Sequence, residues 1–460
     1  MKRHATWFPV ALLLAVSLAV GGCTTAPKFD MQRSLERLKT ISSTDIGRRR
    51  LRQLDISGND VLDEPDWAAL EAVAAAAKAE LTKRSVPIDV HHGLYQGPKK
   101  DAPSVFAALE SEGSAFDVAG LDDAHLRELA IEARWMAQQA RMASVAGGAA
   151  DDRLFGGALA TMVPGYSADR MTPAAVCKAI DELDVEPLEK AGVRPAAIFD
   201  LDSTVWSGNV MDPFLAVLVE DGVPREDANP KLREFLKTLV GADADEIDAA
   251  GIDENTKMLL DRWSNTDLPK EQRISAKDTF YNIVVAMRGM TEAAAKKAAR
   301  KAFEKGAGKF PGWLSKLFTD GGGCGMRQLL ERVRARGIDI YFLSATLDVL
   351  AVEGGRLLGV SEDRVLGSIL AMSDGRYTGE VRDSTYFAKG AITRQWLPAP
   401  PLLAFGDSPR SDFTMLLEAA GVGFMINPRD RLLEKDKEEA NSRFVAVDFE
   451  GTEGDAGGTP

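Results

Sequence analysis

The spacing of apolar residues differs between the two halves of the chain. Up to about residue 190, apolar positions recur three or four residues apart, and this spacing predicts helices at 31–54, 68–83, 121–145 and 172–190. Beyond residue 190, short unbroken apolar runs alternate with helical stretches, as in strands that are buried in a parallel sheet. The pattern therefore predicts a mostly helical N-terminal region followed by an α/β core.

Polar residues directly follow three of the predicted strands, and another stands at the start of a predicted helix. The run 196–199 leads into Asp200 and Asp202, the run 338–343 leads into Ser344, and the run 402–405 leads into Asp407. Lys389 stands at the start of a predicted helix. In open α/β sheets ligands bind outside the carboxyl ends of the strands, so we expect these side chains to form one site.

The residue types at this site suit phosphate chemistry. Asp200 and Asp202 have one residue between them, so one carboxylate can attack an electrophile while the other transfers a proton. A serine followed by backbone N–H groups can hold a phosphate, and a lysine can offset its charge. Because all four histidines lie before the core, Ser-His-Asp and histidine-phosphatase chemistry are excluded there: His4, His91, His92 and His125.

The four pieces, in this order, resemble the haloacid dehalogenase superfamily of hydrolases. The matching residues are Asp200 with Asp202, Ser344, Lys389, and Asp407 with Asp412, and the resemblance covers roughly 195–429. It implies a Rossmann-like parallel sheet. The long helical stretch after the first strand resembles a cap of the phosphoserine-phosphatase-like branch, and we place this cap at about 207–325.

The resemblance implies distinct roles for the acidic residues. Asp200 would be the nucleophile that forms an aspartyl-phosphate, and Asp202 would be the acid and base, with its backbone carbonyl on the metal. Asp200 and Asp407 would bind Mg²⁺ through carboxylate oxygens, and Asp412 would orient these ligands. A second acid two residues after the first implies hydrolysis or transfer of a phosphate ester.

The remaining residues of the resemblance would handle the phosphate. Ser344 and the Ala345 N–H would hold its oxygens, Lys389 would offset charge, and Thr204 would support the loop. The substrate would be a small phosphorylated metabolite of unknown identity, and the sequence does not separate a hydrolase from a phosphotransferase.

The first residues of the chain read as a targeting segment. A basic start is followed by an apolar stretch from Trp7 to Val20, which is short for a membrane span, and then by Gly21, Gly22 and Cys23. This resembles the lipobox of a bacterial lipoprotein, with Cys23 as the lipidated residue. We therefore expect a lipid-anchored protein of the cell envelope, on the periplasmic face of the outer membrane.

A loop near the N-terminus resembles an EF-hand. Its ligand positions would be Asp55, Ser57, Asn59, Val61, Asp63 and Asp66. Asp60 stands where the turn prefers glycine, and Asp66 stands where glutamate is usual, so Ca²⁺ would bind weakly. The alternative interpretations are an acid-rich helix–loop–helix without metal, and a calcium-binding envelope lipoprotein whose core binds phosphate esters without turnover.

The net charge and the cysteine content bear on partners and on disulfide bonding. The net charge of -13 argues against nucleic acid as a partner. Cys177 and Cys324 are expected as two unpaired thiols, since no spacing demands a disulfide, and the alternative is a disulfide between them in an oxidising compartment. The expected organisation is a signal peptide (1–23), an EF-hand-like segment (24–90), a helical region (91–190), a hydrolase core with its cap (191–450) and a disordered tail (451–460).

Overall fold

The structure is a computed structural model that describes the chain in several stretches. These are residues 64–95, 118–145, 170–221, 229–237, 243–251, 254–255, 257–258, 276–307, 310–319, 323–428 and 444–452. The segments expected as signal peptide and calcium loop lie outside them, apart from the last loop residues, which begin helix α3. Within the described part, no helix is both long and apolar enough to cross a membrane.

An eight-stranded sheet forms the centre of the molecule, which confirms the expected α/β fold with a mostly parallel sheet. The strand order is β1-β11-β10-β9-β2-β6-β7-β8, and only the β7–β8 pair is antiparallel. The strands are β1 (Arg170–Met171), β2 (Ala196–Phe199), β6 (Asp339–Leu347), β7 (Val365–Ser373), β8 (Arg376–Asp383), β9 (Leu403–Gly406), β10 (Val422–Ile426) and β11 (Phe444–Val447).

Alternate residues of β2 face two hydrophobic layers. Ala197 and Phe199 belong to one buried cluster, and Ala196 and Ile198 belong to the other. The Phe199 ring stacks on Phe405 of β9 with 4.1 Å between ring centroids. Since β2 is buried on both faces, its four residues read as an unbroken apolar run.

Helices cover both faces of the sheet. The larger cluster includes residues of α6 (Pro173–Glu182), α14 (Met326–Ala335) and α15 (Asp348–Leu357). The smaller cluster includes residues of α16 (Lys389–Trp396) and α17 (Phe413–Leu416). The short helices α7 (Glu186–Lys190) and η9 (Glu362–Arg364) lie in the connections. The sheet is therefore the middle of three layers.

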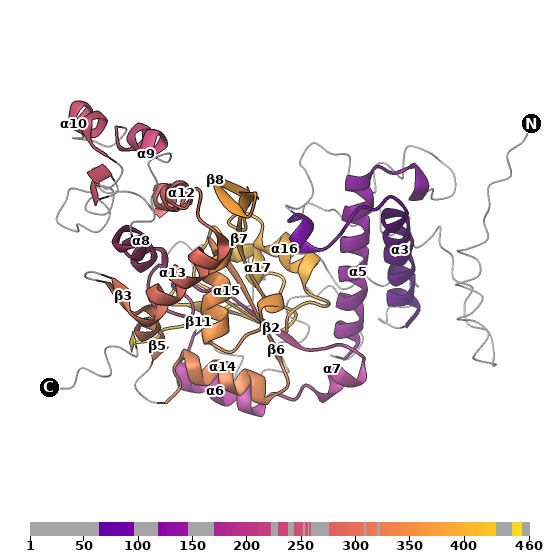
Figure 1. Cartoon of the computed structure of the whole chain (residues 1–460). Coiled ribbons are helices and arrows are strands. Elements are labelled where there is room, and N and C mark those ends of the chain that lie inside the picture. Colours follow the sequence, from indigo (N-terminus) through magenta and orange to yellow (C-terminus); the bar gives the residue numbers. More distant parts are fainter. Residues whose placement is uncertain are drawn as a thin grey trace, which may run out of the picture.

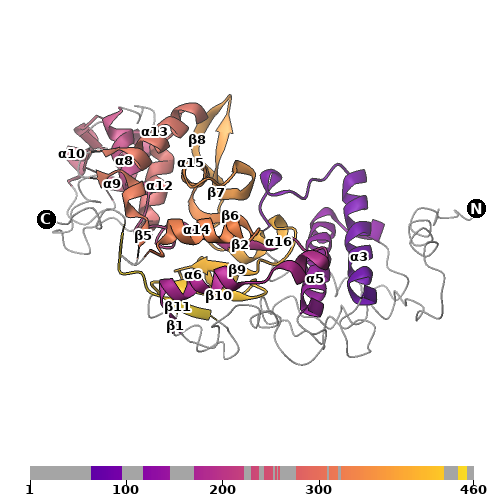
Figure 2. The same cartoon turned by 90° about the horizontal axis from the view of Figure 1, so that it is seen from below.

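Two long helices of the N-terminal region pack together at one end of the molecule (Figures 1 and 2). They are α3 (Glu64–Lys83) and α5 (Asp123–Val145), and they confirm the helices expected at 68–83 and 121–145. The turns η2 (Val90–His92) and η3 (Val118–Gly120) accompany them. Helix α5 also contacts α16, so this region packs against the α/β core.

The cap occupies the opposite end of the molecule (Figure 1). Its described elements lie between β2 and α14, as expected for an insertion after the first strand of the core. They are α8 (Met211–Glu220), α9 (Asn229–Leu236), α10 (Ala244–Ala249), α12 (Ala276–Ala286), α13 (Glu292–Glu304), β3 (Gly306–Ala307), β4 (Phe310–Pro311), η8 (Trp313–Lys316) and β5 (Phe318–Thr319).

Three elements differ from the sequence-based expectation. The helix expected at 172–190 is broken into α6 and α7, because Pro187 has no N–H to donate to the Leu183 carbonyl and fits only in the first turn of a new helix. The strand expected to end at Leu343 continues to Leu347. The first two residues of the expected disordered tail form β12 (Gly451–Thr452), which pairs with β5.

The two core cysteines form a disulfide, and the expectation of unpaired thiols is therefore wrong. Cys177 and Cys324 are bonded across a sequence separation of 147 residues. Helix α6 carries Cys177 and packs against α14, which begins two residues after Cys324. This packing brings together two cysteines whose sequence positions gave no reason to pair them.

Candidate active site

The site lies at the carboxyl ends of the central strands. Strand β2 runs between β9 and β6, with Phe199 opposite Phe405 on one side and Phe342 on the other. The next residue, Asp200, continues the sheet pairing, since its N–H donates to the Phe405 carbonyl at 2.9 Å. Asp407 follows β9 directly, so the two acids leave neighbouring strands at the same edge.

Lys389 joins two of the acids. Its Nζ donates to Asp200 Oδ1 and to Asp412 Oδ1, at 2.6 Å each. The lysine is fully buried, and it is the first residue of α16, as expected from the sequence. Lys389 follows β8 in the sequence, and the fold places it next to the acids that follow β2 and β9.

Asp412 is held by four donors. Its Oδ2 accepts the N–H groups of Asp407 and Ser408, at 3.0 and 2.9 Å. Its Oδ1 accepts the Ser411 hydroxyl at 2.8 Å in addition to Lys389. Gly406 permits this arrangement, because a Cβ there would lie 2.6 Å from the Asp412 Cβ. Asp412 therefore fixes the loop that carries Asp407.

Burial dominates the electrostatics of the nucleophile candidate. Burial, with the charge of Asp412 second, raises the pKa of Asp200 to about 7, although Lys389 acts against this rise. Burial alone would lower the pKa of Lys389, but Asp200 and Asp412 outweigh it and raise that pKa. The ammonium group is therefore kept charged beside the carboxylates.

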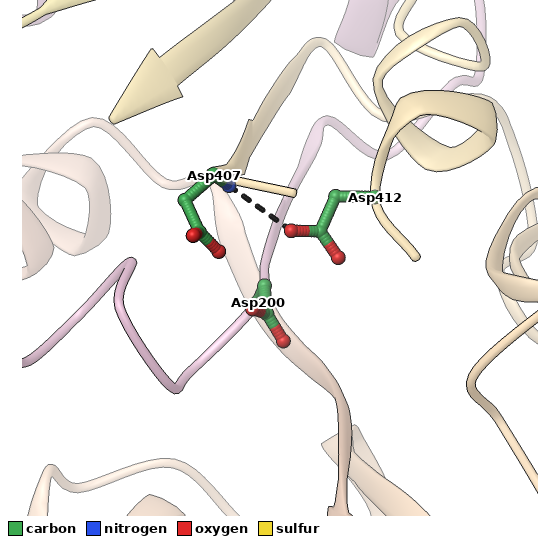
Figure 3. A group of neighbouring side chains, drawn as sticks. All are labelled: Asp200, Asp407 and Asp412. Carbon is green, nitrogen blue, oxygen red and sulfur yellow. Dashed lines mark hydrogen bonds between the residues drawn. The ribbon is translucent and has the colours of Figure 1, made fainter. Parts of the chain in front are cut away.

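Three carboxylates gather around one point of this site (Figure 3). One oxygen from each of Asp200, Asp407 and Asp412 lies within 4.8 Å of the others, and all three residues are buried. Lys389 supplies one positive charge against three carboxylates. Buried carboxylates in excess of nearby cations, with oxygen donors only, suit a hard divalent cation. This donor set fits a divalent cation such as Mg²⁺.

Asp202 sits apart from this cluster on the turn that follows. Its Oδ1 accepts the Trp206 Nε1–H at 2.7 Å and the Val210 N–H at 3.0 Å. Burial raises the pKa of Asp202 to about 6, and these two hydrogen bonds act against the rise. Ser203, the next residue, has a φ of 63°, which turns the chain sharply after Asp202.

The phosphate-binding candidates have different surroundings. Thr204 is buried, and its hydroxyl reaches Asp200 Oδ2 at 3.5 Å. Ser344 is buried, and its Oγ accepts the Thr346 N–H at 3.3 Å. Ser344 and Ala345 lie within β6, not in a turn before α15, because the strand is longer than expected. The β6–β7 register shifts there, because three residues of β6 (344–346) lie opposite one residue of β7 (Gly367) between the pairs Leu343–Leu366 and Leu347–Ser368.

The structure reveals hydroxyl groups that sequence reasoning missed. The Thr385 hydroxyl donates to the Ser344 carbonyl at 2.5 Å, and the Ser368 hydroxyl donates to the Ala345 carbonyl at 3.0 Å. The Ser368 Oγ and Thr385 Oγ1 atoms lie 3.1 Å apart, and the Thr385 N–H donates to Ser368 Oγ at 3.3 Å. They tie the end of β6 to the loop before Lys389. Serine and threonine are common in loops, so no sequence signal separates these two.

Two predicted sites lie outside the described residues. These are the lipidation residue Cys23 and the calcium-loop residues Asp55, Ser57, Asn59, Val61 and Asp63. Asp66 falls within the bounds of α3. Both sites stay predictions.

Comparisons with known proteins concern mainly the core. The family model of the haloacid dehalogenase-like hydrolases matches residues 197–417. A search of curated proteins finds no match. The solved structures that match are distant in sequence, with low overall similarity.

Three of these solved structures are representative. A protein of unknown function from Bordetella pertussis Tohama I is 16% identical, covers 55% of this chain and 98% of its own, and has a TM-score of 0.37. A phosphoserine phosphatase solved as a phospho-aspartyl intermediate analogue is 14% identical, covers 55% and 93%, and has a TM-score of 0.30. A haloacid dehalogenase family hydrolase from Salmonella enterica serovar Typhi is 15% identical, covers 56% and 70%, and has a TM-score of 0.32.

The family match spans the strands β2, β6 and β9 and the helix that begins with Lys389, which are the elements that assemble the site. It includes each acid of the cluster together with Asp202 and Ser344. Residues 197–417 of this chain therefore belong to the haloacid dehalogenase-like hydrolases.

Proposed function

We propose that the protein is a Mg²⁺-dependent phosphomonoester hydrolase that works through an aspartyl-phosphate. The observation that carries this proposal is the buried cluster of Asp200, Asp407 and Asp412 around Lys389, with Asp202 two residues after Asp200. A nucleophilic carboxylate, a separate proton carrier and a charge-neutralising lysine are the groups that this reaction requires.

The chemistry divides between the two acids of the first strand. The Asp200 carboxylate attacks the phosphorus, and the bond from phosphorus to the alcohol oxygen breaks. The leaving oxygen takes the proton of Asp202. A water molecule then attacks the phosphorus and gives a proton to Asp202, while the Asp200 oxygen leaves. The products are an alcohol and inorganic phosphate, and both residues return to their starting state.

The metal would be held at the acidic cluster by Asp200, Asp407 and the Asp202 carbonyl. Bound Mg²⁺ would reduce the repulsion between these carboxylates and a phosphate dianion. Lys389 contributes in the same sense, because its ammonium already contacts Asp200. Asp412 keeps the Asp407 loop in place through two backbone N–H groups.

The test is a panel of small phosphate esters, assayed for released phosphate. Protein stripped of metal with EDTA should be inactive, and added Mg²⁺ should restore turnover. Ca²⁺ is added in a separate arm, because we also propose weak binding at residues 55–66. If no ester is hydrolysed at any Mg²⁺ concentration, a lipoprotein that binds phosphate esters without turnover is favoured. Phosphate moving to an added alcohol would indicate a phosphotransferase.

The Asp200→Asn substitution tests the nucleophile. We expect turnover to fall by more than about 1,000-fold, because the amide cannot form the aspartyl-phosphate. The melting temperature should be unchanged or higher, since a buried acid with a raised pKa is replaced by a neutral group. Asp339→Asn is the matched control, because this aspartate is the first residue of β6 and lies at the opposite end of that strand from the site. Full activity of the Asp200 variant would disprove the proposal.

We also propose that the protein is anchored to the cell envelope through lipid on Cys23, with small phosphorylated metabolites as substrates. The sequence of residues 1–23 supports this location. In a bacterial host, the wild-type protein should sediment with membranes, and Cys23→Ser should appear in the soluble fraction or remain as unprocessed precursor. A wild-type protein found entirely in the soluble fraction would contradict the anchor.

A further inference from the structure

Trp206 contacts the proposed acid and base directly. The indole Nε1 donates to Asp202 Oδ1 at 2.7 Å, and the side chain is fully buried. The second donor to Asp202, the Val210 N–H, reaches the same oxygen at 3.0 Å. Since both donors engage Oδ1, they fix the rotation of the carboxyl group, and the Thr346 hydroxyl is a further group that favours the ionised form of Asp202.

The Trp206 ring is held between the cap and the core. It packs edge-on against Phe303 of cap helix α13, with 5.3 Å between ring centroids. On the core side lies Gly354 of α15, where an added Cβ would be 2.8 Å from Trp206 and 2.9 Å from Phe303. Glycine is required here because the two rings occupy the space of a side chain.

The backbone at Trp206 is also bonded to the segment through which the cap returns to the core. Trp206 forms an isolated bridge with Leu317, and the Ser207 N–H donates to the Lys316 carbonyl at 2.8 Å. Helix α13 is further joined to α15 by Arg300 and Glu353, whose charged atoms lie 3.2 Å apart. The indole therefore sits where both ends of the cap meet the core.

We propose that Trp206 is a positioning residue that couples the seating of α13 to the orientation of Asp202. When Phe303 is seated against the indole, Nε1 holds Oδ1, and the carboxyl group is oriented for proton transfer to the leaving oxygen. This inference rests on the proposed phosphatase function. It assigns the tryptophan a role in leaving-group protonation, which the acid cluster alone does not explain.

The test compares two esters with different leaving groups. Glycerol 2-phosphate releases an alkoxide that needs a proton, whereas p-nitrophenyl phosphate releases a stable phenolate. For Trp206→Phe, which keeps a ring and removes the N–H, kcat/KM should fall about tenfold or more further for the alkyl ester than for the aryl ester. Equal losses for both esters would show a purely structural role and overturn the proposal.

A second variant and a control make the comparison sharper. Gly354→Ala keeps the indole but pushes a methyl group against it, and it should give the same selective loss for glycerol 2-phosphate. Trp313→Phe is the matched control, because this tryptophan is buried in the cap and its Nε1 has no hydrogen-bond partner within the described part of the chain. It should leave the ratio of the two kcat/KM values unchanged.

Thermal unfolding distinguishes failure of this inference from failure of the proposed function. If the wild-type protein hydrolyses neither ester, the phosphatase proposal fails for that panel, and the contact is tested without turnover. The melting temperatures of Trp206→Phe, Asp202→Ala and the double variant are then compared. A loss in the double variant that is smaller than the sum of the single losses supports the link, and additive losses overturn it.

Discussion

Glu128 on α5 is a half-buried carboxyl group with a pKa near neutrality. Burial, with the charge of Glu132 second, raises its pKa from 4.5 to about 7. The folded protein therefore holds a proton that the unfolded chain releases between these values. The stabilisation from this proton is complete below the unfolded pKa and is lost as the pH rises through about 7.

The Glu128→Gln substitution should remove this pH dependence. We expect the variant and the wild-type protein to melt at similar temperatures at about pH 4, and the variant to melt at the higher temperature at about pH 8.5. The measurement is the difference in melting temperature at the two pH values. A difference that does not change with pH would show that Glu128 does not titrate in this range.

At the scale of single residues, the sequence predicted the acids and not the groups that hold them. Asp200, Asp202 and Asp407 could be predicted because they follow apolar runs, and the ends of such strands meet at one edge. Ser411 and Trp206 could not, because their hydrogen bonds depend on how loops fold over those ends.

Helix α16 shows how an element can join two regions of the chain. Its first residue is Lys389, and its last turn carries Arg394, which is buried and forms ion pairs with Glu132 of α5 and with Glu418. Trp135 of α5 also donates to Glu418 at 2.8 Å. Helix α5 thus holds the end of α16 that lies away from the site.

Removing one partner of this network should destabilise the fold strongly. We expect Glu132→Ala to lower the free energy of unfolding by roughly 3–5 kcal/mol, because the buried guanidinium loses a carboxylate. Glu186→Ala is the control. Its pair with Lys190 is exposed, and it should cost roughly 0.5 kcal/mol or less. Urea unfolding measures both values, and equal costs would mean that the Arg394 pair is not a stabilising contact.

The sequence predicted which helices and strands form better than it predicted the residues at which they begin and end. Helix α16 and strand β9 were predicted because the local pattern decides them. The extension of β6 to Leu347 was not, because it depends on a shift in pairing with β7 that leaves no local pattern. The same holds for β12, a pair of residues that is ordered by β5.

At the scale of the whole molecule, long-range pairing was the part that the sequence could not supply. The shared site predicts that β2, β6 and β9 end close together, but it does not predict that the outer strand β1 joins β11 from the far end of the chain. Neither strand was expected. The disulfide was missed for the same reason, since 147 residues separate its cysteines and only the packing of α6 on α14 brings them together.

That disulfide has a consequence for the covalent connectivity of the molecule. The bond closes a ring that contains strand β2, Asp200 with Asp202 and nearly the whole cap. A protease that cuts the chain once between residues 178 and 323 would leave a single molecule under oxidising conditions, with the two fragments still cross-linked. In an oxidising compartment, the cap can therefore be cleaved without being shed.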